Sequence, residues 1–246
     1  MMKKTLILNT AALFAATSLV AGPKGTVIDS VPAPYEPVSD ELGFELSAGY
    51  DTTYIFRGVD FGDHLVWVGL DWETEVAQDL SLGLGAWYGS LAEDPYTELT
   101  LDAGLSYTVG ALTFGAGYTH YFFFQDDADV PEVGATLGFE AGPLDVELGY
   151  FYDFEVEGSY LELAIGTEFA LTERVALAPG AAVAYNFDYY TGTNDWNHIG
   201  VSLGLPITLT STATLTPYIA ANFPLDAISS TEKDQVYGGV SLSVSF

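Results

Sequence analysis

The chain has 246 residues, no cysteine and a formal net charge of −28, from 34 acidic and 6 basic side chains. Without cysteine there is no disulfide, no thiol catalysis, no Cys-ligated metal and no lipoprotein anchor, and a surface this acidic repels nucleic acid and attracts cations. Because 49% of the residues are hydrophobic, the composition excludes disorder and favours a soluble β-protein or a membrane barrel.

The first 21 residues have the pattern of a secretory signal peptide. Lys3 and Lys4 precede an apolar stretch over 5–16 and a segment of small residues that ends near Ala21. Residues 22–43 contain four prolines, which predict an extended periplasmic linker. The linker has few charges, so an acidic pore would not attract it strongly as a plug.

From residue 44 to the end, the pattern predicts an all-β fold, a transmembrane antiparallel up-and-down β-barrel of about twelve strands. The expected strands are 44–57, 64–76, 80–91, 96–109, 112–124, 131–141, 144–156, 159–171, 175–189, 196–209, 213–225 and 235–246. Short connections such as 110–111 alternate with longer ones such as 58–63 and 226–234. This predicts short periplasmic turns, longer extracellular loops and two periplasmic chain ends.

Aromatic residues gather near both ends of the apolar strand faces, as in a barrel that crosses two membrane interfaces. We expect Tyr54 and Phe56 in the outer belt and Phe246 in the inner one. A soluble β-sandwich, the alternative, gives no reason for two belts. The final strand, with its terminal Phe246, resembles the assembly signal of outer-membrane barrels. We therefore expect a Gram-negative outer membrane, with barrel-assembly machinery, lipid and lipopolysaccharide as partners.

The other face of the strands carries most of the charge, with Arg57 as its inward basic side chain. The expected pore-lining acids are Asp51, Asp71, Glu73, Glu98, Asp102, Glu132, Glu147, Asp153, Glu162 and Glu168. Unpaired carboxylates do not remain ionised in a dry interior, so the lumen is expected to hold water. Acidic rings favour cations in a pore. The sequence thus predicts a porin-like passive channel for ions and small cationic or neutral solutes.

Hairpin geometry brings some of these acids opposite one another. We expect Asp153 to face Glu162, and Glu132 to lie towards Asp153. Like charges in such positions need counterions, a raised carboxylate pKa or a bound cation. Counterions in water are the favoured explanation. A divalent-metal site formed by Glu132, Asp153 and Glu162 is the weaker alternative, and no cofactor is expected.

Three short segments carry a family resemblance. The stretch 49–59, with its Tyr54-Ile55-Phe56-Arg57-Gly58 core, resembles the first strand of the TorF-type outer-membrane porin family. Residues 69–72 and 85–90 are similar to the family's second and third elements. The resemblance covers mainly residues 44–90 and implies a porin without naming a solute. Arg57, which the motif contains, is expected to pair with Asp71 or Glu98, or else to set the charge of the outer mouth.

Two other functions are alternatives to a channel. A non-conducting structural or adhesion barrel that binds divalent cations and lipopolysaccharide is the main alternative. An enzyme such as a phospholipase needs a nucleophile beside a base. The chain has three histidines, His64, His120 and His198, and the expected neighbours of His120 include no serine. We therefore predict that the protein is not an enzyme.

Overall fold

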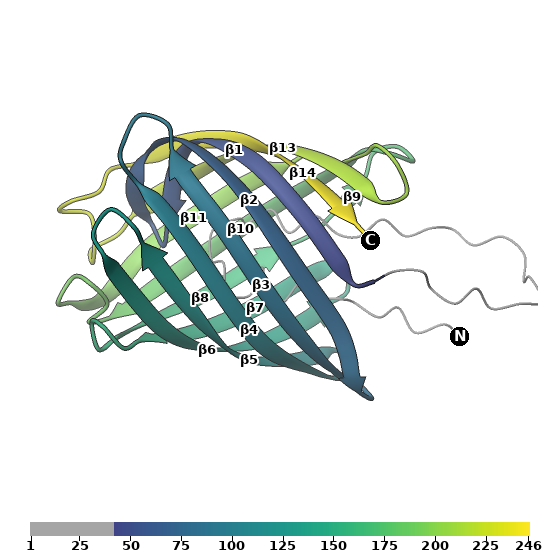
Figure 1. Ribbon diagram of the computed structural model, residues 1–246, viewed down its shortest axis with the longest axis horizontal. Coiled ribbons are helices and arrows are strands. Elements are labelled where there is room, and N and C mark those ends of the chain that lie inside the picture. The colour runs from purple at the N-terminus through teal and green to yellow at the C-terminus, as the bar shows by residue number, and fades with distance from the viewer. Residues whose placement is uncertain (1–41) are drawn as a thin grey trace, which may run out of the picture.

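The computed structural model describes residues 42–246, so the predicted signal peptide (1–21) and most of the predicted linker (22–43) lie outside the described residues. The described chain forms one tilted barrel of strands (Figure 1). The strands are β1 (Phe44–Phe56), β2 (Val59–Ala77), β3 (Leu80–Leu91), β4 (Thr97–Val109), β5 (Leu112–Phe123), β6 (Ala128–Ala141), β7 (Leu144–Asp153), β8 (Gly158–Gly166), β9 (Phe169–Ala170), β10 (Ala176–Phe187), β11 (Asn194–Gly204), β12 (Ile207–Thr208), β13 (Ala213–Pro224) and β14 (Gln235–Ser245). Among these residues no helix is long and apolar enough to cross a membrane.

The strands pair antiparallel in sequence order, and β1 pairs with β14, which closes the sheet. β9 continues β8 along the shared partner β10, and β12 continues β11 along β13. The fourteen segments therefore form twelve wall strands. The break between β11 and β12 falls at Pro206, which has no amide proton to donate to the sheet. The predicted twelve-strand, all-antiparallel barrel is confirmed.

The two rims of the barrel differ in their connections. At the short-turn end, β4 and β5 are joined by Gly110 and Ala111 alone, and the amides of Leu42 and Gly43 donate to the carbonyl of Phe246 over 2.7 and 3.1 Å. Both ends of the described chain therefore lie at this rim (Figure 1). The opposite rim, the long-loop end, includes the connection over 225–234.

The first connection at the long-loop end is shorter than predicted. Instead of a loop over 58–63, Arg57 and Gly58 form a two-residue turn, and β2 begins at once with Val59. Both turn residues have positive φ, 49° and 83°, which is the backbone of a type I′ hairpin turn. The hairpin of β1 and β2 is therefore a tight, well-defined projection rather than a loose loop.

Side chains alternate between the two faces of most strands, as predicted. On β4, Leu101, Leu105 and Tyr107 are exposed, whereas Thr100 and Ser106, at positions of the opposite parity, are buried. Large apolar side chains are exposed in the same way on strand after strand around the barrel. An apolar outer surface of this extent is typical of contact with lipid rather than water.

Tyr54 and Phe56 depart from this alternation and correct the prediction that they lie in an outer belt. Tyr54 is buried at 6% exposure and packs in the interior with Leu65 and Leu91, while the half-buried Phe56 packs against the same cluster. The sheet register shifts between Tyr54 and Ile55, and His64 on the paired strand has a positive φ of 63°. Such irregularities re-aim side chains, which simple alternation cannot anticipate.

Candidate pore and the strap across its mouth

The tip of the β1–β2 hairpin, residues 55–60, crosses the interior of the barrel near the long-loop end. We call this segment the strap. Its tip residue Arg57 contacts Phe151 on β7 and Tyr160 on β8. In the ring of twelve wall strands, β7 and β8 lie opposite β1 and β2. The strap therefore reaches from one side of the barrel to the other.

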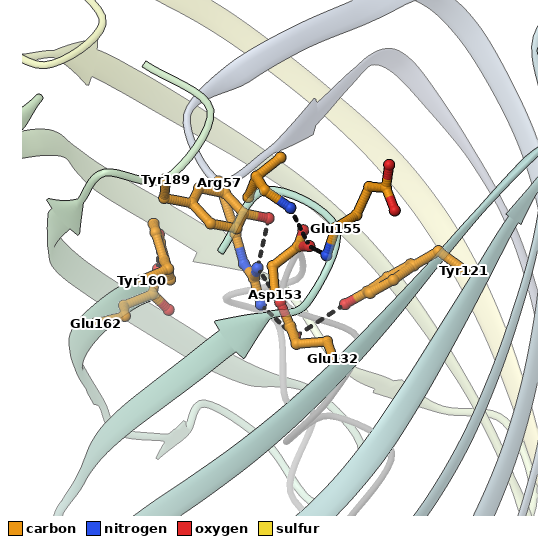
Figure 2. A network of polar contacts seen from close by, with 9 residues as sticks. Arg57, Tyr121, Glu132, Asp153, Glu155, Tyr160, Glu162 and Tyr189 are labelled. Atoms are coloured by element: carbon orange, nitrogen blue, oxygen red, sulfur yellow. Dashed lines mark hydrogen bonds and ion pairs between the residues drawn. The ribbon is translucent and has the colours of Figure 1, made fainter. Parts of the chain in front are cut away.

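Arg57 is anchored by Glu132 on β6 (Figure 2). Its Nη1 donates to Oε2 of Glu132 over 2.5 Å, and its Nη2 donates to Oε1 over 2.8 Å. Both side chains are only 1% exposed. A planar guanidinium and a carboxylate in this two-bond geometry make one of the strongest polar contacts available to a protein. The prediction that Arg57 pairs with Asp71 or Glu98 was wrong in the partner, because the strap carries Arg57 across the barrel.

Aromatic rings surround the guanidinium of Arg57. Its Cζ lies 4.8 Å from the ring centre of Phe151, 4.7 Å from Tyr160, and 5.0 Å from both Phe56 and Tyr189. Cations are attracted to aromatic faces at such distances, most strongly where water is excluded. Nη1 of Arg57 also donates to the hydroxyl oxygen of Tyr189 over 2.6 Å. Burial raises the pKa of Tyr189 although Arg57 opposes the shift, so the phenol stays neutral.

Gly58 docks the strap against a third part of the wall. Its carbonyl accepts a hydrogen bond of 3.0 Å from Nδ2 of Asn222 on β13. A Cβ at Gly58 would lie 2.8 Å from Oδ1 of Asn197, 2.9 Å from Nδ1 of His198 and 2.9 Å from Cδ1 of Ile228. The absence of a side chain is therefore what allows this close approach. Together with Arg57, it fixes the strap to both β6–β8 and β11–β13.

The near side of the strap rests on a cluster of aromatic side chains. Tyr54 packs within 6 Å, ring centre to ring centre, of Phe61, Trp87 and Tyr96. Glu98, only 3% exposed, lies next to these rings. Its carboxylate accepts hydrogen bonds from the hydroxyls of Tyr54, Tyr96 and Thr100. Glu98 is thus a structural acid inside the mouth rather than a free pore-lining charge.

A row of carboxylates runs along the interior face of the wall from one end of the barrel to the other. We define this carboxylate row as Glu45, Asp71, Asp102, Glu132 and Asp153, with Gly85 and Thr119 at the two intermediate positions. With Gly85 and Thr119 included, each residue in this series pairs with the next one in the sheet register. Because barrel strands tilt relative to the barrel axis, a row of residues perpendicular to the strands changes its height along that axis from strand to strand. It starts near the short-turn rim at the beginning of β1 and ends at the last residue of β7.

The next row towards the short-turn end is made of glycines. Gly83, Gly104, Gly117 and Gly134 face one another in register across β3 to β6. They have no side chains to project into the lumen beside the carboxylates of Asp71 and Asp102. Both of these acids are half-buried, in contrast to the buried Glu132. The wall from β2 to β6 therefore places two carboxylates next to a row of positions without side chains.

Other predicted pore residues have different surroundings. Asp51 accepts hydrogen bonds from Nε1 of Trp67 (2.8 Å) and the hydroxyl of Tyr218 (2.6 Å). Glu73 is half-buried on β2, next to the glycine row in register with Gly83. Glu168 lies in the break between β8 and β9.

The predicted register of β7 and β8 was wrong. Glu162 faces Gly149 rather than Asp153, and Asp153 faces Gly158. The hairpin turns at 154–157, about two residues earlier than predicted, so the partner of Asp153 is displaced by four residues, from Glu162 to Gly158. The predicted neighbourhood of Glu132 and Asp153 is confirmed, because these two face each other directly.

The three weak metal candidates already have protein partners. Glu132 binds Arg57, Glu162 accepts the hydroxyl of Tyr160 over 2.6 Å, and Oδ1 of Asp153 accepts the amides of Glu155 and Val156 (Figure 2). Within residues 42–246, no group of three or more His, Asp or Glu side chains has an arrangement that suits a metal ion. Asp153 instead closes the turn at the end of β7.

The three histidines occupy separate places. Nδ1 of His64 lies 2.7 Å from the hydroxyl of Tyr50, and that of His120 lies 2.7 Å from the hydroxyl of Tyr118. His198, buried on β11, bonds Oδ1 of Asn197. His120 also contacts Asp129, at the lipid-facing side of β5 and β6.

Sequence reasoning did not single out the residues that surround Arg57. In an alternating strand, Phe151 lies on the same face as Asp153, and Tyr160 lies on the same face as Glu162. The inward direction of both rings could therefore be predicted from strand alternation. Tyr189 was expected at the end of a strand over 175–189, but β10 ends at Phe187 and Tyr189 lies in the connection that follows. Its contact with Arg57 follows only from the three-dimensional arrangement.

Comparison with known proteins identifies the class of fold. No protein-family model and no curated protein matches the chain. Its fold is similar to an outer membrane channel from Pseudomonas putida F1, with a TM-score of 0.58 and 14% identity over 89% of this chain and 100% of that one. The KdgM porin gives 0.53 and 12% over 82% and 99%. The translocator domain of the autotransporter NalP from Neisseria meningitidis gives 0.54 and 13% over 85% and 90%. At these identities the likeness concerns the fold alone, that of an outer-membrane-type β-barrel.

Proposed function

We propose that the protein is a porin-like channel of the outer membrane with an acidic, water-filled lumen that prefers cations. The observation that carries the proposal is the carboxylate row, which runs on the interior face from the short-turn end to the strap. The channel and the porin among the structures of similar fold support the same function.

The charge balance of the interior is the reason to expect a preference for cations over anions. Of the three Lys and Arg residues within 42–246, only Arg57 is buried, and Glu132 neutralises it. Asp71 and Asp102 lie two strands apart, about 10 Å at the usual spacing of ~4.8 Å. Carboxylates at such intervals along a low-dielectric wall attract cations and repel anions. Small cationic or neutral solutes are the expected cargo.

Orientation follows the usual design of such barrels, in which short turns lie on the periplasmic side. The short-turn end, with Leu42 and Phe246, then faces the periplasm, and the strap lies beneath the extracellular mouth. The segment that resembles the TorF-type porins contains the strap, so we propose that relatives of this family share it.

The strap favours one alternative function. A segment that spans the interior and is fixed on both sides obstructs the mouth. A structural barrel that does not conduct, with divalent cations and lipopolysaccharide as its ligands, is the second candidate. The two functions differ in a single property, the passage of ions.

Planar-bilayer recording across a KCl gradient tests the proposal. We expect a cation-directed zero-current potential for the wild-type protein, and a smaller one for the Asp71→Asn/Asp102→Asn variant. The matched control is Glu93→Gln/Asp94→Asn, which removes the same charge from an exposed connection and has less effect. An anion-directed potential would contradict the proposal. Absence of current from both the wild-type protein and an Arg57→Ala variant would favour the structural barrel.

A further inference from the structure

The surroundings of Arg57 have the features of a binding site for a cation. We define the guanidinium cage as Glu132, Phe151, Tyr160 and Tyr189, which contribute one carboxylate, three rings and a hydroxyl. They come from β6, β7, β8 and the connection after β10, whereas their occupant comes from the opposite hairpin. The cage is therefore part of the wall, and Arg57 is a tethered ligand inserted into it.

The cage contacts only the end of the arginine side chain. Hydrogen bonds to Glu132 and Tyr189 come from Nη1 and Nη2, and the buried Nε has no hydrogen-bond partner within the described residues. Free arginine, or any solute with an alkylguanidinium group, presents the same two nitrogens. A lysine ammonium cannot reproduce the two parallel bonds, since it is a compact point charge. The chemistry of the cage thus selects guanidinium over ammonium.

The tethered ligand is held in an unfavourable backbone conformation. Arg57 has a φ of 49°, a left-handed conformation that non-glycine residues rarely adopt and that costs free energy. A free guanidinium solute has no such constraint. The residue next to the cage, Tyr190, is 58% exposed and its ring packs on Tyr189 at 4.7 Å, so one wall of the cage reaches the surface of the long-loop end.

We propose that the guanidinium cage binds the guanidinium group of a solute that arrives from the long-loop end, in competition with Arg57, and that this exchange releases the strap and opens the channel. The proposal rests on the proposed channel function for its last step but not for the binding step. The ligand class is arginine, arginine-containing peptides and other alkylguanidines. Because attraction to the acidic interior concentrates cations, the same solutes are those the lumen favours.

Binding is tested without conduction by calorimetric titration of the full, refolded chain. The Arg57→Ala variant, whose cage is vacated, is titrated with L-arginine and with L-citrulline, which has the same shape without the charge. We expect saturable binding of L-arginine and none of L-citrulline. In the Arg57→Ala/Glu132→Gln variant the affinity for L-arginine falls about tenfold or more. Equal affinity with and without the Glu132 carboxylate, or no binding to Arg57→Ala, would overturn the site.

Release of the strap is tested by conductance. L-arginine added to the long-loop side is expected to increase the wild-type current, and L-citrulline is not. The Arg57→Lys variant keeps the positive charge but loses the two-bond contact, so it responds at a lower L-arginine concentration than the wild type. A cation-selective current that is indifferent to L-arginine overturns the proposed release while leaving the channel intact. Binding without any current leaves the cage intact and overturns the channel function.

Discussion

Arg57 and Glu132 are 75 residues apart in the chain and meet inside the barrel through two parallel hydrogen bonds of 2.5 and 2.8 Å. The contact connects the tip of one hairpin to a strand on another side of the wall. It combines full burial, opposite charge and four neighbouring rings at one point. This pair fixes the strap to β6, while Gly58 and Asn222 hold it on the side of β13.

A double-mutant cycle measures that dependence. Arg57→Gln and Glu132→Gln each leave a buried charge without its partner, which costs about 3–5 kcal/mol where the charge stays buried. The double variant is expected to lose less than the sum, with a coupling free energy of about 1–3 kcal/mol. Urea unfolding in lipid vesicles provides the four free energies. Additive losses, within about 0.5 kcal/mol, would show that the two groups do not interact.

Gly58 provides a test of strap docking. Gly58→Ala adds a Cβ at a φ of 83° and within 3 Å of Asn197, His198 and Ile228. Gly110→Ala is the matched control, because its φ is 66° but nothing lies within 4 Å of the added Cβ. The left-handed backbone destabilises each variant by about 1–2 kcal/mol, and only Gly58→Ala is destabilised further by steric conflict. We therefore expect faster proteolytic cleavage of the strap in Gly58→Ala alone; equal cleavage in both variants would argue against tight docking.

The hydroxyl of Tyr54 is expected to stabilise Glu98. Tyr54→Phe keeps the ring among its aromatic neighbours but removes the 3.1 Å bond to Oε2 of Glu98. A hydrogen bond to a charged group contributes about 1.5–3 kcal/mol, so the free energy of unfolding falls by that amount. Tyr88→Phe serves as the comparison, since Tyr88 is exposed on the outer face. An equally small loss of unfolding free energy in both variants would show that the Tyr54 hydroxyl does not stabilise Glu98.

The outer surface is expected to contact lipid. Leu70 on β2 is exposed, and Leu70→Lys would place a charge on that surface. Near the middle of a bilayer this costs about 2–4 kcal/mol. Ala111→Lys, in the turn between β4 and β5, is the control that adds the same charge at the rim. Unfolding from lipid vesicles gives both values, and a tolerated Leu70→Lys would contradict the predicted membrane-facing surface.

The bounds of several wall strands were predictable from sequence, because alternating side chains indicate a strand and turn residues indicate where it ends. The expected segment 80–91 coincides with β3, and 44–57 differs from β1 by one residue. The pairing of Glu132 with Asp153 in the sheet register was also predictable, since the short turn 142–143 fixes that hairpin. The β7–β8 pairing failed because its turn was centred too far along the chain, and a small displacement changes every partner.

The contents of the interior were less predictable, for a physical reason. Alternation says which face a side chain takes, but not how far a hairpin bends across the barrel. The bulge after Tyr54 and the positive φ values of Arg57 and His64 redirect the strap, and none of these has a periodic signature. Arg57 was therefore recognised as the inward cation and Glu132 as an inward acid, but the pairing of the two was not predicted.

The zero-current potential of the Arg57→Ala variant in a KCl gradient tests most directly whether the carboxylate row makes the channel selective for cations. With the strap released, the carboxylate row dominates the path from Asp71 to the mouth. We expect a measurable current and a cation-directed potential that decreases when Asp71→Asn and Asp102→Asn are added. An anion-directed potential, or a potential unchanged by loss of these two carboxylates, would contradict the assignment of the row as the selective element of a channel.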